Sequence, residues 1–333
     1  MPGPNKSESV GTFLFQKVCP AFSVPLTLPK AYPASVNTQK RALLLIAFTL
    51  LLAPWLPAQE NKTTAAGKHS LWKVQGKESV LYLLGSIHVL KKENYPLPPP
   101  IESAFTNAGV VVFETDVDAI EKPDVMMKLA TKGQLPQGET LRDHLSAPVY
   151  AKFSNYLSQA GMPAQLFDSF SPAMAAIGLV ALELKKMDLD PEYGLDKHFF
   201  KQAKDEGKKI IPLETIDFQI GLMTEFSKEE GELLMKATLK DIDKMQKELG
   251  EMLRAWEKGD AAQLEALLNE SMEEAPVIFK RLVTDRNQRW APQIEELLRG
   301  KENAMVIVGA GHLVGANGVV ELLRKKGFKV VQQ

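Results

Sequence analysis

Two copies of one short unit constrain this chain more than any other feature: an apolar run that ends in Gly-x-x-His. The first is LYLLGSIH at residues 81–88, and the second is VIVGAGH at residues 306–312. Glycine permits a sharp turn with positive φ at the end of a strand. Ligands of open α/β sheets bind in the crevice outside the carboxyl ends of the strands. We therefore expect both turns to bring His88 and His312 to one point.

Two further apolar strands are predicted to end in carboxylates. Residues 109–116, GVVVFETD, form a continuous apolar run that ends in Glu114 and Asp116, and residues 208–214, KKIIPLE, end in Glu214. A charged group at the end of a hydrophobic strand is costly unless it is paired or coordinated. One such ending is ordinary for a capped loop. Four strands that each finish in His or Glu favour a common site.

The residue types at these strand ends predict a metal site. His88, His312 and Glu114 would bind one divalent metal, since imidazole and carboxylate ligands suit Zn, Mn, Fe or Co. Glu214 or Asp116 would then act as general base. The sequence has no HExxH, GxSxG or GxxxxGK[ST] motif, which argues against standard zincin, serine-hydrolase and P-loop mechanisms.

Other polar residues are weaker candidates. Arg286 and Asn287, in DRNQRW, could bind a substrate carboxylate through the guanidinium fork or could form a pair on a helix surface. We assign Arg286 the role of orienting the substrate. Asp196 and His198, in GLDKHF, lie at a predicted helix start, where an aspartate is often only a favourable N-terminal charge.

A dinucleotide-binding loop is the alternative interpretation of the second glycine-rich turn. Gly309, Gly311 and Gly315 follow a predicted strand and precede a predicted helix, which is the right context. The spacing, however, is GxGxxxG and not GxGxxG. The acidic residue expected about 20 positions later is also missing, because the next strand ends in Gln332 and Gln333. The pattern therefore disfavours a dinucleotide site.

Strands alternate with helices along residues 68–333, which predicts a single α/β domain with a mixed central sheet flanked by helices. Residues 217–299 are helical almost throughout and are expected to form a large helical insertion that covers the cleft. The expected strands are residues 70–74, 79–86, 109–116, 208–214, 304–309 and 328–331, and the expected helices outside the insertion include residues 172–186, 194–206 and 316–326.

The N-terminal part predicts export. Residues 40–58 carry two positive charges, an apolar stretch of roughly 12 residues and a small-residue end, as in a secretory signal peptide cleaved after Ala58. The stretch is shorter than the ~20 residues that span a bilayer. We expect a periplasmic or extracellular protein, anchored to the membrane only if this segment stays uncleaved. Residues 1–39 would be a disordered extension, or translation would begin near Val36 and residues 1–35 would not belong to the protein.

Composition limits the classes of partner. The chain has 333 residues, 45% of them hydrophobic, and a formal net charge of −1. It therefore lacks the basic excess that a nucleic-acid-binding face needs, and we expect no nucleic-acid partner. Its one cysteine, Cys19, precedes the expected cleavage site, so the mature chain would have no disulfide and no thiolate ligand.

Five segments together resemble one family: LLGSIHVL, VVVFETDVD, YGLDKHFFKQAKDEGKKIIPLETIDFQ, TDRNQRWAPQIEELL and MVIVGAGHLVGANGVVELLRKKGFKV. They occur in this order and are similar to the TraB/GumN family, itself distantly similar to Tiki-type metalloproteases, over residues 68–333. The resemblance implies a metal-dependent hydrolase of peptidase type, with an α/β fold, two GxxH motifs and an acidic residue. These fall on His88, His312 and Glu114.

The expected function is thus an exported metallohydrolase that acts on a peptide or a small molecule. The alternative is a non-catalytic binding protein, which would capture a peptide signal, a metal or haem in the same cleft. A third interpretation treats both histidines as structural residues with local hydrogen-bond partners. The sequence leaves the substrate, the metal and the oligomeric state open.

Overall fold

The computed structural model describes residues 67–333, except for the side chains of residues 270–274. The extension at residues 1–39 and the signal segment at residues 40–58 lie outside the described residues. Within the described part, no helix combines the length and the apolar character that crossing a membrane requires.

Six strands form one mixed sheet: β1 Leu71–Gln75, β2 Val80–Ser86, β3 Val110–Phe113, β4 Lys209–Pro212, β5 Ala304–Gly309 and β6 Val330–Gln332. Their order across the sheet is β4-β3-β5-β2-β1-β6. The strands β4, β3, β5 and β2 are parallel, whereas β1 and β6 add an antiparallel edge. The predicted mixed α/β sheet is therefore confirmed, with all six predicted strands present.

The helices connect these strands and continue beyond them. They are α2 Pro99–Asn107, α3 Val117–Ile120, α4 Pro123–Lys132, α5 Leu141–His144, α6 Ala147–Gln159, α7 Pro172–Lys186, α8 Leu195–Asp205, α9 Ile216–Thr224, α10 Lys228–Asp241, α11 Met245–Glu257, α12 Ala261–Glu274, α13 Pro276–Phe279, α14 Asp285–Arg299 and α15 Val319–Lys325. Single 3₁₀ turns, among them η5 Ala310–His312, and a π-helical turn at Lys280–Thr284 complete the described part.

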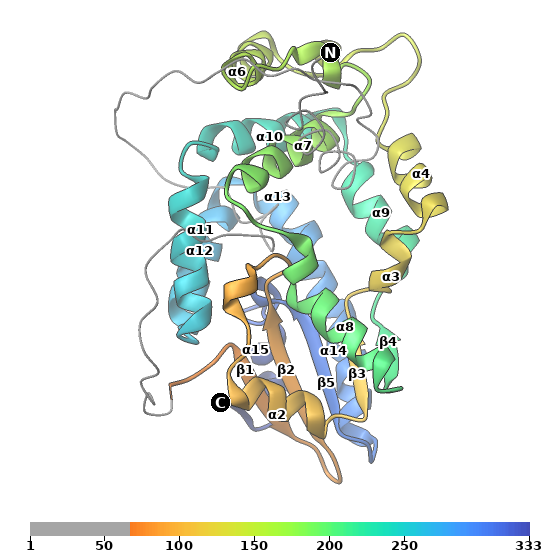
Figure 1. Cartoon of the computed structure of the whole chain (residues 1–333), viewed down its shortest axis with the longest axis vertical. Coiled ribbons are helices and arrows are strands. Elements are labelled where there is room, and N and C mark those ends of the chain that lie inside the picture. The colour runs from red at the N-terminus through yellow and green to blue at the C-terminus, as the bar shows by residue number, and fades with distance from the viewer. Residues whose placement is uncertain (1–66) are drawn as a thin grey trace, which may run out of the picture.

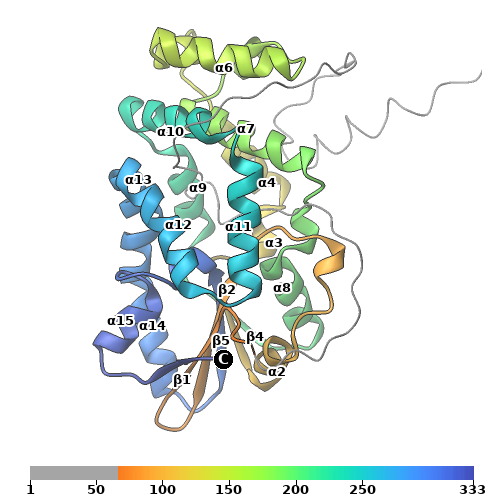
Figure 2. The same cartoon turned by 90° about the vertical axis from the view of Figure 1, so that its left-hand side faces the viewer.

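Helices cover both faces of the sheet. Figures 1 and 2 show α2 and α8 on one face and α14 and α15 on the other. All residues of the interior strands β3 and β5 are buried, as their continuous apolar sequences predict. The strand β4 lies at the sheet edge and is less buried, and an edge position tolerates its terminal Pro212.

A layer of helices lies beyond the carboxyl ends of the parallel strands (Figure 1). The helices α9 to α13 belong to it. Apart from Ile216, they fall within residues 217–299, but their packing partners extend beyond that range. The helices α6 and α7, which precede this range, also pack against α10, and α14 packs against α15 and β2 at the sheet. The contact with α6 and α7 covers the buried face of α10, which includes Leu234 and Met235.

The two GxxH turns follow neighbouring parallel strands at nearly the same level. Gly85 pairs with Val308, and Ser86 pairs with Gly309. Contrary to our expectation, neither Gly85 nor Gly309 has a positive φ. Gly85 is needed for a different reason: a Cβ atom on residue 85 would lie 3.1 Å from both Cα and Cβ of Ala310. Close packing of one turn on the other therefore explains this glycine.

This contact predicts the cost of a methyl group at residue 85. The variant Gly85→Ala should lower the free energy of unfolding by about 1–3 kcal/mol, the usual cost of overpacking. The matched control is Gly109→Ala, where the nearest atom to a new Cβ would be 4.0 Å away. Urea unfolding followed by circular dichroism would measure both. Equal stability of the two variants would contradict the proposed close contact.

Candidate active site

The carboxyl ends of β3 and β4 hold two glutamates side by side. The amide of Glu214 donates to the carbonyl oxygen of Glu114 at 2.9 Å, which continues the parallel pairing past the last strand residues. The carboxylate of Glu114 also accepts from the amide of Gly309, at the end of β5, at 2.8 Å. Backbone hydrogen bonding beyond the strand ends thus fixes the backbone positions from which both glutamate side chains extend.

The guanidinium of Arg286, on the first turn of α14, joins these carboxylates to the second GxxH turn. Its Nη2 donates to Glu114 at 2.5 Å and to Glu214 at 2.8 Å, and its Nε donates to both oxygens of Glu214 at 3.1 Å. Its Nη1 donates to the carbonyl oxygen of Leu282 at 3.2 Å and faces Nε2 of His312 at 3.1 Å. These contacts use every N–H group of the guanidinium.

His312 is buried and neutral. Its Nδ1 lies 2.7 Å from Oδ1 of Asn287. An amide oxygen only accepts, so Nδ1 carries the proton and Nε2 presents a lone pair to Arg286. Burial and the positive charge of Arg286 lower the pKa of the ring to about 3. Trp290 packs against this pair, with its ring centre 4.5 Å from that of His312 and 4.6 Å from Cζ of Arg286.

His88 lies in the same charged region but has a different partner. Its Nδ1 donates to the carboxylate of Asp196, which also accepts from the hydroxyl of Ser86 at 2.5 Å. Burial alone would lower the pKa of the ring, but the charge and hydrogen bond of Asp196, with the charge of Glu114, raise it to about 9. Gly194, just before α8, permits this approach, since a Cβ there would lie 2.0 Å from the carbonyl oxygen of His88.

Buried charges balance one another in the cluster. Burial by itself would raise the pKa of the Glu114 carboxyl, but the charges of Arg286 and the two histidines and the Gly309 amide hold it well below its usual range. Burial by itself would lower the pKa of the Arg286 guanidinium, because it too disfavours the charged form. The two glutamates outweigh this effect and raise that pKa. Glu114 and Arg286 are therefore both ionised at neutral pH.

The structure brings most of the predicted residues together, but not all. Glu114, Glu214, Arg286 and His312 are in direct contact, and His88 interacts with Glu114 through its charge. Asp116 instead caps α3, where its carboxylate accepts from the amide of Ala119. That position favours Glu214 over Asp116 as the candidate base.

Two interpretations of polar residues need correction. Arg286 and Asn287 do not form a surface pair, because both side chains are buried. Arg286 also has no unused N–H with which to orient a substrate in this arrangement. Asp196, which looked like a simple helix N-terminal charge, is the partner of His88. Its place in the first turn of α8, within a segment that resembles the family, was the only sequence signal for that role. His198 packs against Tyr95 instead.

The donor atoms match those of a metal site in kind. Both histidines have Nδ1 occupied by a side chain from a helix, which leaves Nε2 as the ligand atom. Such a partner on the second ring nitrogen is typical of metal-binding histidines. The carboxylate of Glu114 interacts electrostatically with both rings. In the described part of the chain, however, no group of three or more His, Cys, Asp or Glu is arranged closely enough to hold a metal ion. Arg286 lies against His312 instead.

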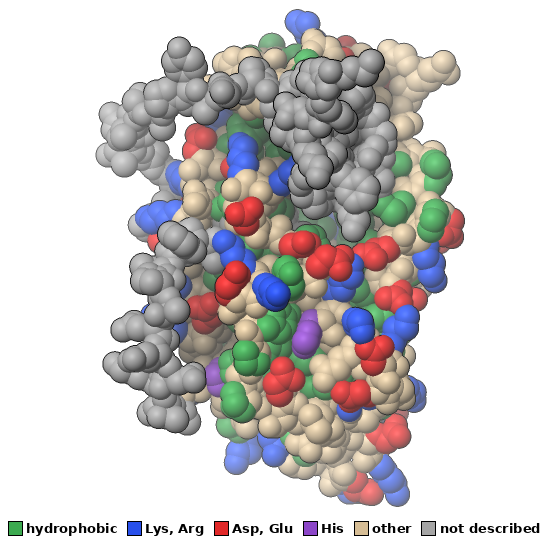
Figure 3. All heavy atoms as spheres, viewed as in Figure 1, with side chains coloured by type: hydrophobic (Ala, Val, Ile, Leu, Met, Phe, Trp, Pro, Cys, Tyr) green, Lys and Arg blue, Asp and Glu red, His purple; other side chains and the backbone are tan. Residues whose placement is uncertain are grey.

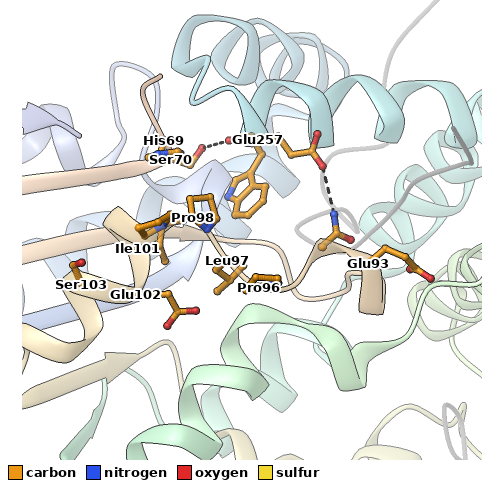
Figure 4. A pocket seen from close by; sticks show the side chains of 13 residues that line it. His69, Ser70, Glu93, Pro96, Leu97, Pro98, Ile101, Glu102, Ser103 and Glu257 are labelled. Atoms are coloured by element: carbon orange, nitrogen blue, oxygen red, sulfur yellow. Dashed lines mark hydrogen bonds between the residues drawn. The ribbon is translucent and has the colours of Figure 1, made fainter. Parts of the chain in front are cut away.

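A separate cavity of about 700 Å³ lies next to the first GxxH turn, between α2 and the end of α11 (Figure 4). Leu97 and Ile101 form apolar walls, and Glu257 lies at the α11 side. Trp256 also lines it and donates through Nε1 to the carbonyl oxygen of Gly85 at 2.6 Å. None of the predicted catalytic or metal-binding residues lines this cavity. It is thus a neighbour of the candidate site and not part of it.

The molecular face that carries α2 and α8 has mixed charge. Figure 3 shows Lys and Arg side chains interspersed with Asp and Glu, with hydrophobic side chains gathered between them. No continuous basic stripe is visible among the described residues of this face, although nucleic-acid binding would need one. The absence of a nucleic-acid partner stays a prediction.

Comparison with known proteins places the chain in a family. The model of the TraB/PrgY/gumN family matches residues 70–332, nearly the whole described part. The chain belongs to this family. The match includes both GxxH turns and the two glutamate-bearing strand ends, so the candidate site lies within the family region.

Proteins similar to this chain include some with and some without a named activity. The uncharacterized protein YbaP of Escherichia coli K12 is 25% identical over 243 residues, which cover 73% of this chain and 87% of YbaP. Metalloprotease TIKI2 of Xenopus tropicalis is 24% identical over 312 residues, covering 78% of this chain and 59% of TIKI2. Human metalloprotease TIKI1 is 22% identical over 312 residues, which cover 78% of this chain and 61% of TIKI1. No solved structure matches significantly.

Loss of the central cation should destabilise this family member strongly. The variant Arg286→Ala leaves two buried carboxylates unpaired, which should lower the free energy of unfolding by about 3–5 kcal/mol. Arg299→Ala, which removes an exposed ion pair with Glu295 on the same helix, should cost less than about 1 kcal/mol. Chemical denaturation of both variants would measure the difference. A small loss for Arg286→Ala would contradict the central role of its guanidinium.

The charge of His88 should depend on Asp196. In the metal-free protein, Asp196→Asn should lower the pKa of the His88 ring well below 9, since it removes the charge that opposes burial. The folded-state pKa exceeds the ordinary value of about 6.5. The charged ring therefore stabilises the native fold fully below pH ~6.5, and this contribution is lost as pH rises through about 9. NMR titration of the His88 ring would measure its pKa in both proteins. The control variant Asp116→Asn should leave this pKa unchanged.

Proposed function

We propose that the chain is an exported metal-dependent hydrolase of peptidase type. One observation carries the proposal: two GxxH turns on adjacent parallel strands hold two oriented imidazoles beside the ionised Glu114. The distant relatives named metalloproteases TIKI1 and TIKI2 support the same reaction class. Export rests on the sequence of residues 40–58 alone.

The proposed roles follow from the donor atoms. His88 and His312 would hold one divalent metal, Zn, Mn, Fe or Co, through Nε2, together with Glu114. When bound, such a metal supplies Lewis acidity, which polarises a substrate carbonyl and makes water a better nucleophile at neutral pH. Asp196 and Asn287 would keep the two imidazoles oriented through their Nδ1 atoms.

Glu214 is the proposed general base. Its carboxylate is buried and accepts from Arg286 and, at 2.8 Å, from Nε2 of Gln219. These donors fix its orientation, which a base needs in order to take a proton from a nearby water. We propose Arg286 as a positioning residue for Glu114 and Glu214, in place of the substrate-orienting role assigned from the sequence.

A non-catalytic binding protein is the second candidate. The observation that favours it is the full pairing of both glutamates with Arg286, whose N–H groups occupy carboxylate oxygens that a base would present to water. Such a protein would capture a peptide signal, a metal or haem in the same cleft and would need no proton transfer. Removal of the Glu214 carboxylate should therefore strongly reduce turnover in a hydrolase but leave ligand binding intact in a binding protein.

Metal content tests the shared site. We expect the purified full-length chain to hold a stoichiometric amount of a divalent metal, and the double variant His88→Ala/His312→Ala to lose it while keeping its circular dichroism spectrum. Elemental analysis after reloading with Zn, Mn, Fe or Co would measure both proteins. A wild-type chain that stays metal-free after reloading would contradict the proposed metal site.

Removal of the base separates the two candidates. If the chain is a hydrolase, Glu214→Gln should reduce turnover of a cleaved peptide by about 10²–10⁴-fold and leave the metal bound. A peptide-library cleavage screen of the wild type would first identify the peptide. Unchanged turnover would exclude Glu214 as the base. Ligand binding without turnover in the wild type would favour the binding protein.

A further inference from the structure

The buried guanidinium of Arg286 contacts the same atoms that a metal would need. The single lone pair of His312 lies on Nε2 and faces Nη1 of Arg286 at 3.1 Å. Oε2 of Glu114 accepts from Nη2 of Arg286 at 2.5 Å. The other oxygen, Oε1, lies 3.9 Å from His312 Nε2 and accepts from the Gly309 amide. Two of the three proposed ligands are thus already bonded to a cation that belongs to the chain.

A lone pair cannot be shared between a guanidinium N–H and a metal ion. His312 is 1% exposed and Trp290, which packs on its ring, is fully buried, so neither ring can move aside cheaply. Placing a divalent cation beside the positive guanidinium would also cost Coulomb energy in a region of low effective dielectric constant. Both cations therefore cannot occupy the bonding positions on His312 and Glu114 at once.

We infer that Arg286 competes with the divalent metal for His312 and Glu114, so that the chain itself sets how tightly its site binds metal. The inference rests on the proposed function, because it concerns the same metal site. The metal-free chain is then a charge-balanced folded state, with Arg286 in place of the metal. Metal binding requires Nη1 and Nη2 to leave His312 and Glu114.

The contacts of Arg286 allow such a partial withdrawal. Its Nε and Nη2 bond to Glu214, which follows β4 whereas His312 follows β5, and Glu214 can keep the cation paired. The residue lies two positions after the π-helical turn Lys280–Thr284, whose Leu282 carbonyl accepts from Nη1. Turns of π helix are rare and are frequent at functional sites. Arg286 is thus held by Glu214 and Leu282 even when its contact with His312 is removed.

Under competition, the apparent metal affinity is the intrinsic affinity multiplied by the fraction of chains whose site is free of the guanidinium. The variant Arg286→Met keeps a long side chain but removes the charge and the N–H donors. We expect it to bind Co²⁺ at least tenfold more tightly than the wild type. Isothermal titration of the chelator-treated full-length chain with CoCl₂ would measure the dissociation constants. Visible Co²⁺ absorption would show whether nitrogen ligands take part.

The control is Arg289→Met on the same helix. Arg289 lies over Phe218 and 4.0 Å from Glu214, and it is half-exposed. Its loss removes an equal charge near Glu214 but no contact with His312, so its Co²⁺ affinity should stay within twofold of the wild type. An equal gain in both arginine variants would show a general charge effect and would overturn the inference.

The single variant leaves Glu114 and Glu214 unpaired, which threatens folding. The double variant Arg286→Met/Glu214→Gln removes one of these charges and keeps His88, His312 and Glu114, and it should also bind Co²⁺ more tightly. Equal affinity of the wild type and both Arg286 variants would overturn the competition and leave the proposed metal site intact. No Co²⁺ binding by any of them would remove the metal site and the inference together.

Discussion

The buried guanidinium of Arg286 is the interaction on which the rest of the site depends. Glu114 and Glu214 follow hydrophobic strands, and both buried carboxylates accept from the same Nη2 of one cation. Arg286 supplies that cation, and its remaining donors reach His312 and the Leu282 carbonyl. A planar, permanently charged group with several donors suits this place better than a lysine would.

The sheet makes this meeting possible. Four parallel strands end at the same edge, and backbone hydrogen bonds set their relative heights, so side chains just past the strand ends converge. The close packing of Gly85 on Ala310 brings the first GxxH turn against the second. The helices α8 and α14 then begin above these turns and provide Asp196 and Asn287. The site is thus a product of strand register and of where two helices start.

Hydrophobic patterning was a reliable guide to the sheet and less so to the helical layer. Strands such as β3 and β5 are continuous apolar runs between polar residues, so a local window suffices to find them. The helices α6 and α7 look like ordinary amphipathic or apolar helices in the sequence. Only their contact with α10 shows that they belong to the same layer, and packing partners of helices far apart in the chain leave no local signal.

The sequence by itself determined the strands, the two GxxH units and the acidic residues that follow the apolar runs. These features suffice to place His88, His312, Glu114 and Glu214 at one edge of a sheet, because parallel strands align their carboxyl ends. The tertiary structure alone decided the partners of these residues. It paired His88 with Asp196 and buried Arg286 among its neighbours, since hydrogen bonds between distant segments depend on how helices pack on the sheet and not on local pattern.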